Sequence, residues 1–171
     1  MKRLYIVRHA KALLGSANLP DLQRPILEKG KQRTKLLLDY LLLNNTSVDM
    51  IISSPAVRAL ETALIVGNAL RFTEEEIKKD SILYYADEEQ LMNLFFDLPH
   101  KLDSLMIVGH NPTLTYFANE FIENKIEMLP TSACVCLDFD TDKWEDISSL
   151  NSKLRFVITP KTIKEKKVNR I

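Results

Sequence analysis

The chain has 171 residues, of which 46% are hydrophobic and 27% are charged, a composition typical of one globular domain that can bury a full core. Lys and Arg together number 23, as do Asp and Glu, and this balance excludes a global field that would attract nucleic acid or a membrane surface. No apolar run approaches a membrane span, and the run that follows Met1 is too short for a signal-peptide core, so we expect a cytoplasmic protein.

The first predicted element is a short buried strand at residues 4–7, where four apolar residues stand together. The run ends abruptly on Arg8 and His9. In an open α/β sheet, ligands bind beyond the carboxyl ends of the parallel strands, so both side chains are expected at that edge. Arginine offers a planar fork of donors for phosphate or carboxylate, and histidine can act as nucleophile, acid or base near neutral pH.

A long loop is expected at residues 10–25, followed by a helix at residues 32–43 with a broad apolar face. Loops of this length are often functional. Within the loop, Arg24 precedes Pro25 and is a candidate for the same pocket as Arg8. The alternative for Arg24 is that it holds its own loop through backbone carbonyls.

A second buried strand is predicted at residues 49–53. Ser54 is a suitable N-cap and Pro55 suits a first helical position, so we expect a helix from there to about residue 70. This arrangement places Arg58 in the first turn of the helix, close to the end of the strand.

A short third strand is predicted at residues 81–84. Asp87 then caps a helix, with Gln90 three residues further on as in a capping box. The apolar residues of this helix that face inward are expected to be Leu91, Leu94 and Phe95.

The fourth buried strand, at residues 105–108, again ends in polar residues. His110 follows its end, and Asn111 as N-cap with Pro112 at the first helical position predicts a helix through residue 121. A third strand end therefore delivers a polar side chain to the edge of the sheet already reached by Arg8, His9 and Arg58.

Two further strands, at residues 133–139 and 154–158, complete a sheet of about six strands in one domain covering residues 1–160. Cys134 and Cys136 lie two apart on a strand, so they share one face and are expected to be core residues. Residues 161–171 carry five basic side chains and one acidic one, and are expected to form a loosely ordered tail.

Two arginines, two histidines and two helix starts around one crevice describe a site for a phosphoryl group. The four glycines cannot be assembled into a dinucleotide-binding turn or a P-loop: Gly15, Gly30, Gly67 and Gly109. No cluster of carboxylates suggests a metal-dependent phosphatase. We therefore expect neither a metal nor another cofactor.

Three motifs of the chain resemble those of the histidine phosphatase superfamily, which is phosphoglycerate mutase-like. They are Val7-Arg8-His9-Ala10, Ser53-Ser54-Pro55 followed by Arg58, and Gly109-His110-Asn111-Pro112. The short length and the segment at residues 21–27 resemble the small SixA-type members, which lack large lid insertions. The resemblance implies a three-layer α/β/α sandwich with a mixed, mostly parallel sheet.

The resemblance also implies roles for the candidate residues. His9 would attack phosphorus and carry the phosphoryl group, while Arg8 and Arg58 would hold its oxygens and His110 would add a donor. Substrate-binding roles are expected for Arg24 and Asn111. SixA-type members are associated with phosphohistidine on protein phosphotransfer domains, so the expected partner is a phosphohistidine-bearing protein or a small phosphorylated substrate, with no nucleic acid or membrane. We expect a monomer.

The chain departs from the mutase-like branches of the superfamily at the general acid, the residue that protonates the leaving group. At the corresponding place only Asp87 and Glu88 are candidates, and both are better explained as a helix cap and a first-turn charge. Without a strong acid the site suits a phosphoramidate, since imidazole (conjugate-acid pKa about 6.5) leaves readily. Two alternatives stay open: a small-molecule phosphomonoesterase that uses Asp87 or Glu88, and a noncatalytic module that binds phosphorylated protein.

Overall fold

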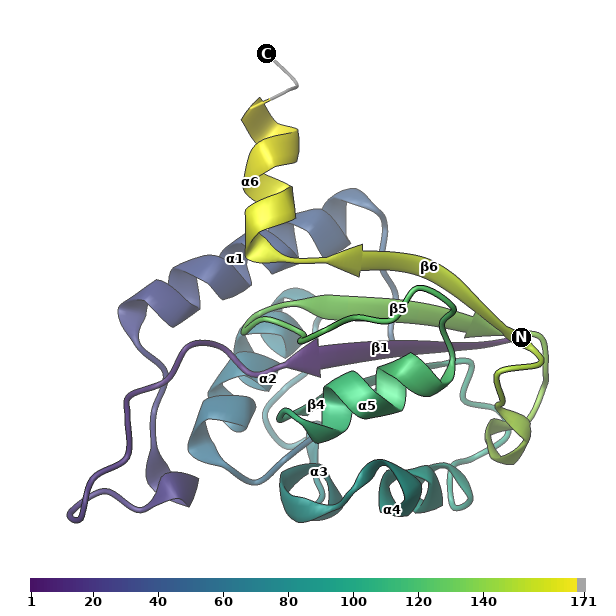
Figure 1. The fold of residues 1–171 in the computed structure, drawn as a ribbon, viewed down its shortest axis with the longest axis horizontal. Coiled ribbons are helices and arrows are strands. Elements are labelled where there is room, and N and C mark those ends of the chain that lie inside the picture. The colour runs from purple at the N-terminus through teal and green to yellow at the C-terminus, as the bar shows by residue number, and fades with distance from the viewer. Residues whose placement is uncertain (169–171) are drawn as a thin grey trace.

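The computed structural model describes residues 1–168, and side chains in the last helix as far as residue 165. One mixed sheet has the strand order β3-β2-β4-β1-β5-β6 (Figure 1). Its strands are β1 (Lys2–Arg8), β2 (Met50–Ser53), β3 (Lys78–Lys79), β4 (Ser104–Gly109), β5 (Cys134–Phe139) and β6 (Ser152–Ile158). β1, β2, β3 and β4 pair in parallel, whereas β5 pairs antiparallel with both β1 and β6, which confirms the predicted sheet.

Helices cover both faces of the sheet (Figure 1). The α-helices are α1 (Glu28–Leu43), α2 (Val57–Ala69), α3 (Ile82–Tyr85), α4 (Glu88–Met92), α5 (Thr113–Glu120) and α6 (Pro160–Val168). Three short 3-10 helices are η1 (Asp21–Gln23), η2 (Asn93–Phe95) and η3 (Trp144–Asp146). Residues of α1, α2 and α6 pack on one face and residues of α3, α4 and α5 on the other, so the three-layer α/β/α architecture is confirmed.

The alternation of side chains along the central strand explains the two helical layers. On β1, Leu4 and Ile6 pack into the apolar cluster that includes residues of α4 and α5. Tyr5 and Val7 point the other way, into the cluster that includes residues of α1 and α2. All four side chains are buried, and a strand buried on both faces is expected to be apolar throughout, as this one is.

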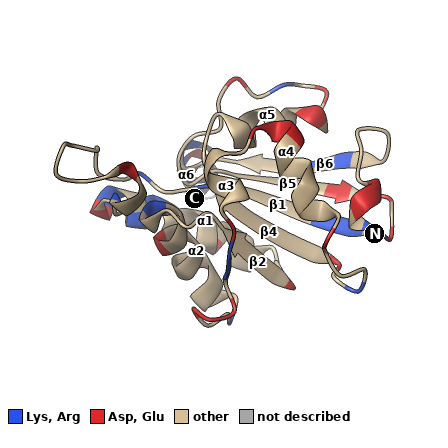
Figure 2. Cartoon of the chain, turned by 90° about the horizontal axis from the view of Figure 1, so that it is seen from below, with Lys and Arg blue, Asp and Glu red and all other residues tan. Residues whose placement is uncertain are grey.

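Charged residues are intermixed rather than gathered by sign. In the view of Figure 2, both basic and acidic residues lie along α1 and in the loops around the sheet. Within residues 1–168, no helix is both long and apolar enough to cross a lipid bilayer.

The third strand of the sheet differs from the prediction. The prediction of a strand at residues 81–84 is wrong, because this run forms the single helical turn α3, with Leu83 buried and Tyr85 72% exposed. β3 lies slightly earlier and consists of Lys78 and Lys79, both exposed at the edge of the sheet. Two exposed lysines carry no apolar signal, so sequence patterning could not find this strand.

Three helix starts also differ. α1 begins at Glu28, one turn before the predicted residue 32. α2 begins at Val57 and α5 at Thr113, so Ser54 and Asn111 are not the N-caps that the sequence predicted. By contrast, the capping box between Asp87 and Gln90 at the start of α4 is confirmed.

The prediction of a loosely ordered tail is wrong for its described part. α6 continues from Pro160 to Val168, and Ile163 is buried in the same apolar cluster as residues of α1. This buried side chain explains why the segment folds back onto the domain. Residues 169–171, the rest of the predicted tail, lie outside the described residues. Cys134 and Cys136 are buried core residues with free thiols, as expected.

Candidate active site

The parallel strands β2, β4 and β1 bring the polar residues together at their shared carboxyl edge. Backbone pairing continues one residue beyond the strands, because the His9 amide donates to the Gly109 carbonyl (3.0 Å) and the Ser54 amide donates to the Val108 carbonyl (2.9 Å). The His9 and His110 rings consequently lie 4.8 Å apart between centroids. These two histidines, which are 101 positions apart in the sequence numbering, are neighbours in the fold.

The backbone after His9 is held on two sides. The Ala10 amide donates to the Thr62 hydroxyl of α2 at 2.9 Å. On the side of α1, the backbone of Lys11 passes so close to Gly30 that a Cβ there would collide with the Lys11 carbonyl oxygen. Glycine at position 30 is therefore required by the close approach of two backbone segments. Both contacts fix the direction in which the chain leaves His9.

The His9 ring is oriented by a backbone carbonyl. Its Nδ1 lies 2.7 Å from the Ala10 carbonyl oxygen, which can only accept a hydrogen bond. In the neutral ring the proton is therefore on Nδ1, and Nε2 keeps its lone pair. Burial lowers the pKa of His9 to about 4, with Arg58 and Arg8 adding to the effect. The His9 ring is thus neutral near pH 7 and presents the lone pair of Nε2, the form in which a histidine can act as a nucleophile.

His110 is also neutral near pH 7. Burial, the neighbouring His9 ring and Arg58 lower its pKa to about 3. Its Nε2 lies 2.8 Å from the Ser54 hydroxyl, whereas its Nδ1 is buried and has no hydrogen-bond partner among residues 1–168. A buried polar atom without a partner is costly, and at a binding site it indicates an atom that a ligand contacts.

Both predicted arginines leave one buried donor free. Arg8 donates through Nη1 to the Leu129 carbonyl at 2.7 Å, and burial lowers the pKa of Arg8. Arg58 uses Nη1 and Nη2 for Asp21, at 2.6 Å to its carbonyl and 2.8 Å to its carboxylate. The Nε atoms of both arginines are buried and have no hydrogen-bond partner in the part of the chain that the structure describes. Together with His110 Nδ1 they supply unsatisfied groups that suit a tetrahedral oxyanion.

Asp21 is a member of the site that sequence reasoning missed. Its carboxylate accepts hydrogen bonds from Arg24 Nη1 (2.6 Å), Arg58 Nη2 (2.8 Å) and the Tyr84 hydroxyl (2.8 Å). Desolvation alone would raise the pKa of Asp21, but these three hydrogen bonds lower it well below its usual range. Two signals were available, its place in a long loop and in the segment at residues 21–27 that resembles the SixA-type members, but neither indicated that Asp21 would reach Arg58.

Arg24 makes contacts that hold its own loop, which is the role that the sequence left open as the alternative to substrate binding. Its Nε donates to the Leu13 carbonyl at 2.5 Å and its Nη1 to Asp21. The Arg24 charge contributes to lowering the pKa of His9, so it lies near the pocket as well. A substrate-binding role for Arg24 stays a prediction.

Of the remaining candidates, Asn111 shares a hydrogen-bond acceptor with Arg8. Its Nδ2 donates to the Leu129 carbonyl (3.0 Å), the acceptor that Arg8 also uses, and its Oδ1 is buried without a partner. Asp87 accepts the Gln90 amide at 2.7 Å as a helix cap, and Glu88 lies in the first turn of α4. Among the described residues, neither carboxylate has a hydrogen bond or ion pair with the histidines or arginines of the site.

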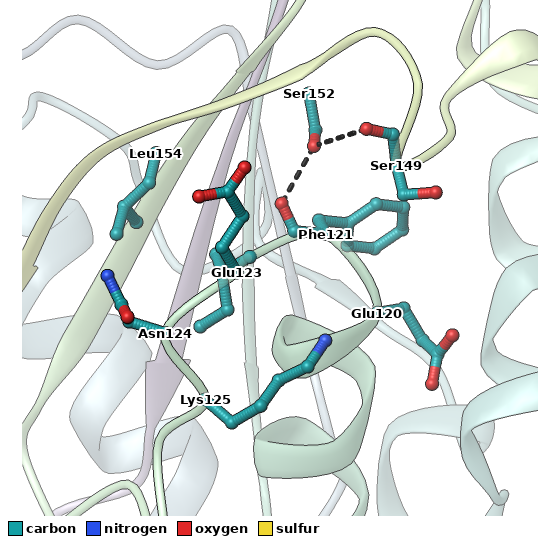
Figure 3. Close-up of a pocket in the computed structure, with 9 residues that line it drawn as sticks. Glu120, Phe121, Glu123, Asn124, Lys125, Ser149, Ser152 and Leu154 are labelled. Carbon is teal, nitrogen blue, oxygen red and sulfur yellow. Dashed lines mark hydrogen bonds between the residues drawn. The ribbon is translucent and has the colours of Figure 1, made fainter.

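Residues 1–168 contain no group of three or more His, Cys, Asp or Glu side chains that could hold a metal ion. A surface pocket lies elsewhere, between the end of α5 and the start of β6 (Figure 3). There the Ser152 hydroxyl donates to the Phe121 carbonyl at 2.7 Å, and the lining includes Glu120, Glu123 and Lys125 but no arginine or histidine. Its single cationic side chain stands beside two carboxylates, so this pocket lacks the arginine and histidine donors that lie at the edge of the sheet.

We expect His9 to titrate near pH 4 rather than near its ordinary value of 6.5. Because the pKa in the folded state is lowered, the ring stays neutral and nucleophilic above about pH 4 and is lost as a nucleophile when pH falls through that value. The unfolded chain takes up its proton first, so the free energy of unfolding should fall as pH drops from 6.5 towards 4. NMR titration of the ring measures the midpoint, and a midpoint at the ordinary value would contradict the burial of His9.

Comparisons with known proteins identify similar sequences and similar folds. No family model matches the sequence. The phosphohistidine phosphatase SixA of Escherichia coli (strain K12) is 23% identical over 159 residues, which cover 89% of this chain and 97% of the relative. A crystal structure from Agrobacterium tumefaciens assigned as phosphohistidine phosphatase SixA aligns with a TM-score of 0.79 and 25% identity over 93% of this chain and 98% of that one. The protein histidine phosphatase SixA complexed with tungstate gives a TM-score of 0.75 and 23% identity, covering 94% and 99% of the two chains.

The mixed six-stranded sheet with helices on both faces is the fold of the SixA phosphohistidine phosphatases with which the chain aligns. The predicted similarity to the small SixA-type members of the histidine phosphatase superfamily is confirmed over nearly the whole length of the chain.

Proposed function

We propose that this chain is a phosphatase that removes the phosphoryl group from phosphohistidine in a protein, through a phosphorylated His9 intermediate. The observation that carries the proposal is the free lone pair on His9 Nε2 beside the unpartnered donors of Arg8 and Arg58. The SixA relatives are phosphohistidine phosphatases by name, and one of them binds tungstate, a tetrahedral oxyanion.

In the first step, the lone pair of His9 Nε2 attacks phosphorus. The phosphorus–nitrogen bond of the substrate breaks and its electron pair leaves on the substrate imidazole. When the other ring nitrogen of the substrate already carries a proton, the leaving group departs as neutral imidazole. The Nδ1–H bond to the Ala10 carbonyl supports the positive charge that develops on the His9 ring. Arg8 and Arg58 stabilise the phosphoryl oxygens.

In the second step, water attacks the phosphorus of phosphorylated His9. The phosphorus–Nε2 bond breaks, its electron pair returns to Nε2, and inorganic phosphate leaves with the oxygen of water. The water proton is taken up by phosphate or solvent. His9 is then restored to the neutral form in which it began, which its low pKa favours.

The carboxylates of the site favour an imidazole over an alkoxide as the leaving group. Asp21 is hydrogen-bonded to the site arginine Arg58, but its lowered pKa keeps it ionised and unable to protonate an alkoxide. Asp87 is engaged as a helix cap. Imidazole needs no such acid, because its conjugate acid has a pKa of about 6.5. A cytoplasmic location and a monomeric state stay predictions from the sequence.

The test compares two substrates at neutral pH. A phosphotransfer domain carrying phosphohistidine should lose phosphate at least about 100-fold faster, per enzyme, than a simple alkyl phosphate. Phosphate release from each is followed against the spontaneous loss measured without enzyme. Comparable rates on both substrates would favour the small-molecule phosphomonoesterase and direct attention to Asp87 and Glu88. Binding of phosphorylated protein without any release would leave the noncatalytic module.

A further inference from the structure

We propose that Ser54 is a positioning residue that places the proton of the neutral His110 ring on Nδ1, so that Nδ1–H can donate to the bound oxyanion. Ser54 is fully buried, and its hydroxyl oxygen lies 2.8 Å from His110 Nε2. The inference rests on the proposed function only in placing an oxyanion in the pocket.

The hydrogen bonds of the Ser54 hydroxyl determine where its proton points. The Ala56 amide donates to the Ser54 oxygen at 3.2 Å, so one lone pair of that oxygen is already used. The hydroxyl hydrogen then needs an acceptor, and among the described residues only His110 Nε2 is within hydrogen-bond distance. If Nε2 carried the proton instead, the Ser54 hydroxyl hydrogen would be buried without a partner, which is unfavourable.

Because the His110 ring is neutral, the nitrogen that carries its single proton determines whether Nδ1 is a donor or an acceptor. Burial together with the nearby His9 and Arg58 keeps its pKa low, so the ring is neutral near pH 7 and carries one proton. With the proton on Nδ1, the unpartnered nitrogen is a donor, as an oxyanion requires. With the proton on Nε2, the same nitrogen would present a lone pair and repel the oxygens of a phosphoryl group.

The first test reads the protonated nitrogen directly. Two-bond proton–nitrogen correlation spectra of ¹⁵N-labelled protein at pH 7 distinguish the two neutral forms of each histidine ring. We expect wild-type His110 to carry its proton on Nδ1 and Ser54→Ala to shift it largely to Nε2. His9 should stay protonated on Nδ1 in both proteins, because the Ala10 carbonyl holds it.

The matched control is Ser53→Ala. Ser53 is also fully buried, but its hydroxyl donates to the Ser54 carbonyl at 3.0 Å and not to a histidine. The Ser53→Ala spectrum should show His110 unchanged. A wild-type His110 ring protonated on Nε2, or a ring that stays protonated on Nδ1 in Ser54→Ala, would overturn the inference even if the variant were less stable.

The second test measures binding of tungstate by calorimetry. Because a hydrogen bond to a charged group is involved, Ser54→Ala should raise the Kd for tungstate about tenfold, and His110→Ala should do the same or more. In the His110→Ala background, Ser54→Ala should add less than about a twofold change, since Ser54 acts through His110. Fully additive losses, or no tungstate binding by the wild type, would overturn the proposed role.

These readouts do not depend on turnover. A wild-type protein that shows the expected His110 proton and binds tungstate, yet releases no phosphate from phosphohistidine, would end the proposed function and support the role of Ser54. The opposite pattern, with phosphate release intact and His110 protonated on Nε2, would end the role of Ser54 alone.

Discussion

Replacement of His9 by alanine should lower phosphate release from a phosphohistidine protein by at least about 1000-fold. The remaining donors of Arg8, Arg58 and His110 can still bind the phosphoryl group, but no other described nitrogen combines a free lone pair with an orienting bond like that of His9 Nδ1 to Ala10. Single-turnover measurements of phosphate release check the loss, and a ³²P-labelled substrate should leave an acid-labile label on wild type only.

The matched control is His100→Ala. His100 is 65% exposed in its side chain, and its nearest charged partner is Glu145, at 3.8 Å between Nδ1 and Oε2. Release by His100→Ala should stay within about twofold of wild type, because an exposed side chain of this kind contributes little to stability or to the site. Full turnover by His9→Ala, or labelling of that variant, would place the nucleophile elsewhere.

The sheet was predictable because its strands are buried on both faces. The apolar runs around Leu4, Ile51 and Leu105 have no polar alternation, which is typical of central parallel strands covered by helices. The same reasoning failed at residues 81–84, where an equally apolar run forms one helical turn instead. A run of four residues contains too little of either period to separate the two structures, and the true edge strand, Lys78–Lys79, has no apolar residue.

The site was predictable where it depends on strand order and not where it depends on loop conformation. Arg8, His9, Arg58 and His110 follow strand ends, and strand ends of one parallel sheet meet at one edge whatever the loops do. Asp21 reaches Arg58 across 37 sequence positions through the path of a long loop, which no local pattern encodes.

At Ser54 and Asn111, tertiary contacts replace the helix-capping role that these residue types favour. Both residues are favourable N-caps by type, yet neither caps a helix. Ser54 contacts His110, and Asn111 contacts the carbonyl that also accepts from Arg8. These contacts depend on the tertiary structure, so the local sequence pattern could not reveal that neither residue caps a helix.

Arg58 is hydrogen-bonded to Asp21, so a substrate would compete with Asp21 for the guanidinium group. Both terminal nitrogens of Arg58 donate to Asp21, and only Nε is left free. An incoming phosphoryl group therefore meets Arg58 through Nε, or displaces the Asp21 carboxylate, which is about half exposed and can reach water. Arg58 holds the loop through Asp21, and we propose that it also stabilises the oxyanion, so a substitution must separate the two roles.

Arg58→Lys should lower kcat/KM for the phosphohistidine protein by about 100-fold. Lysine keeps the charge and can still reach a carboxylate, but it has no equivalent of the Nε donor and no planar fork. Arg24→Lys is the matched control, because Arg24 bonds the same carboxylate at 2.6 Å and also bonds the Leu13 carbonyl. If Arg58 acts on the phosphoryl group and Arg24 only holds the loop, Arg24→Lys should cost less than about tenfold. Steady-state kinetics of both variants measure the difference, and equal losses would mean that Arg58 contributes only by holding Asp21.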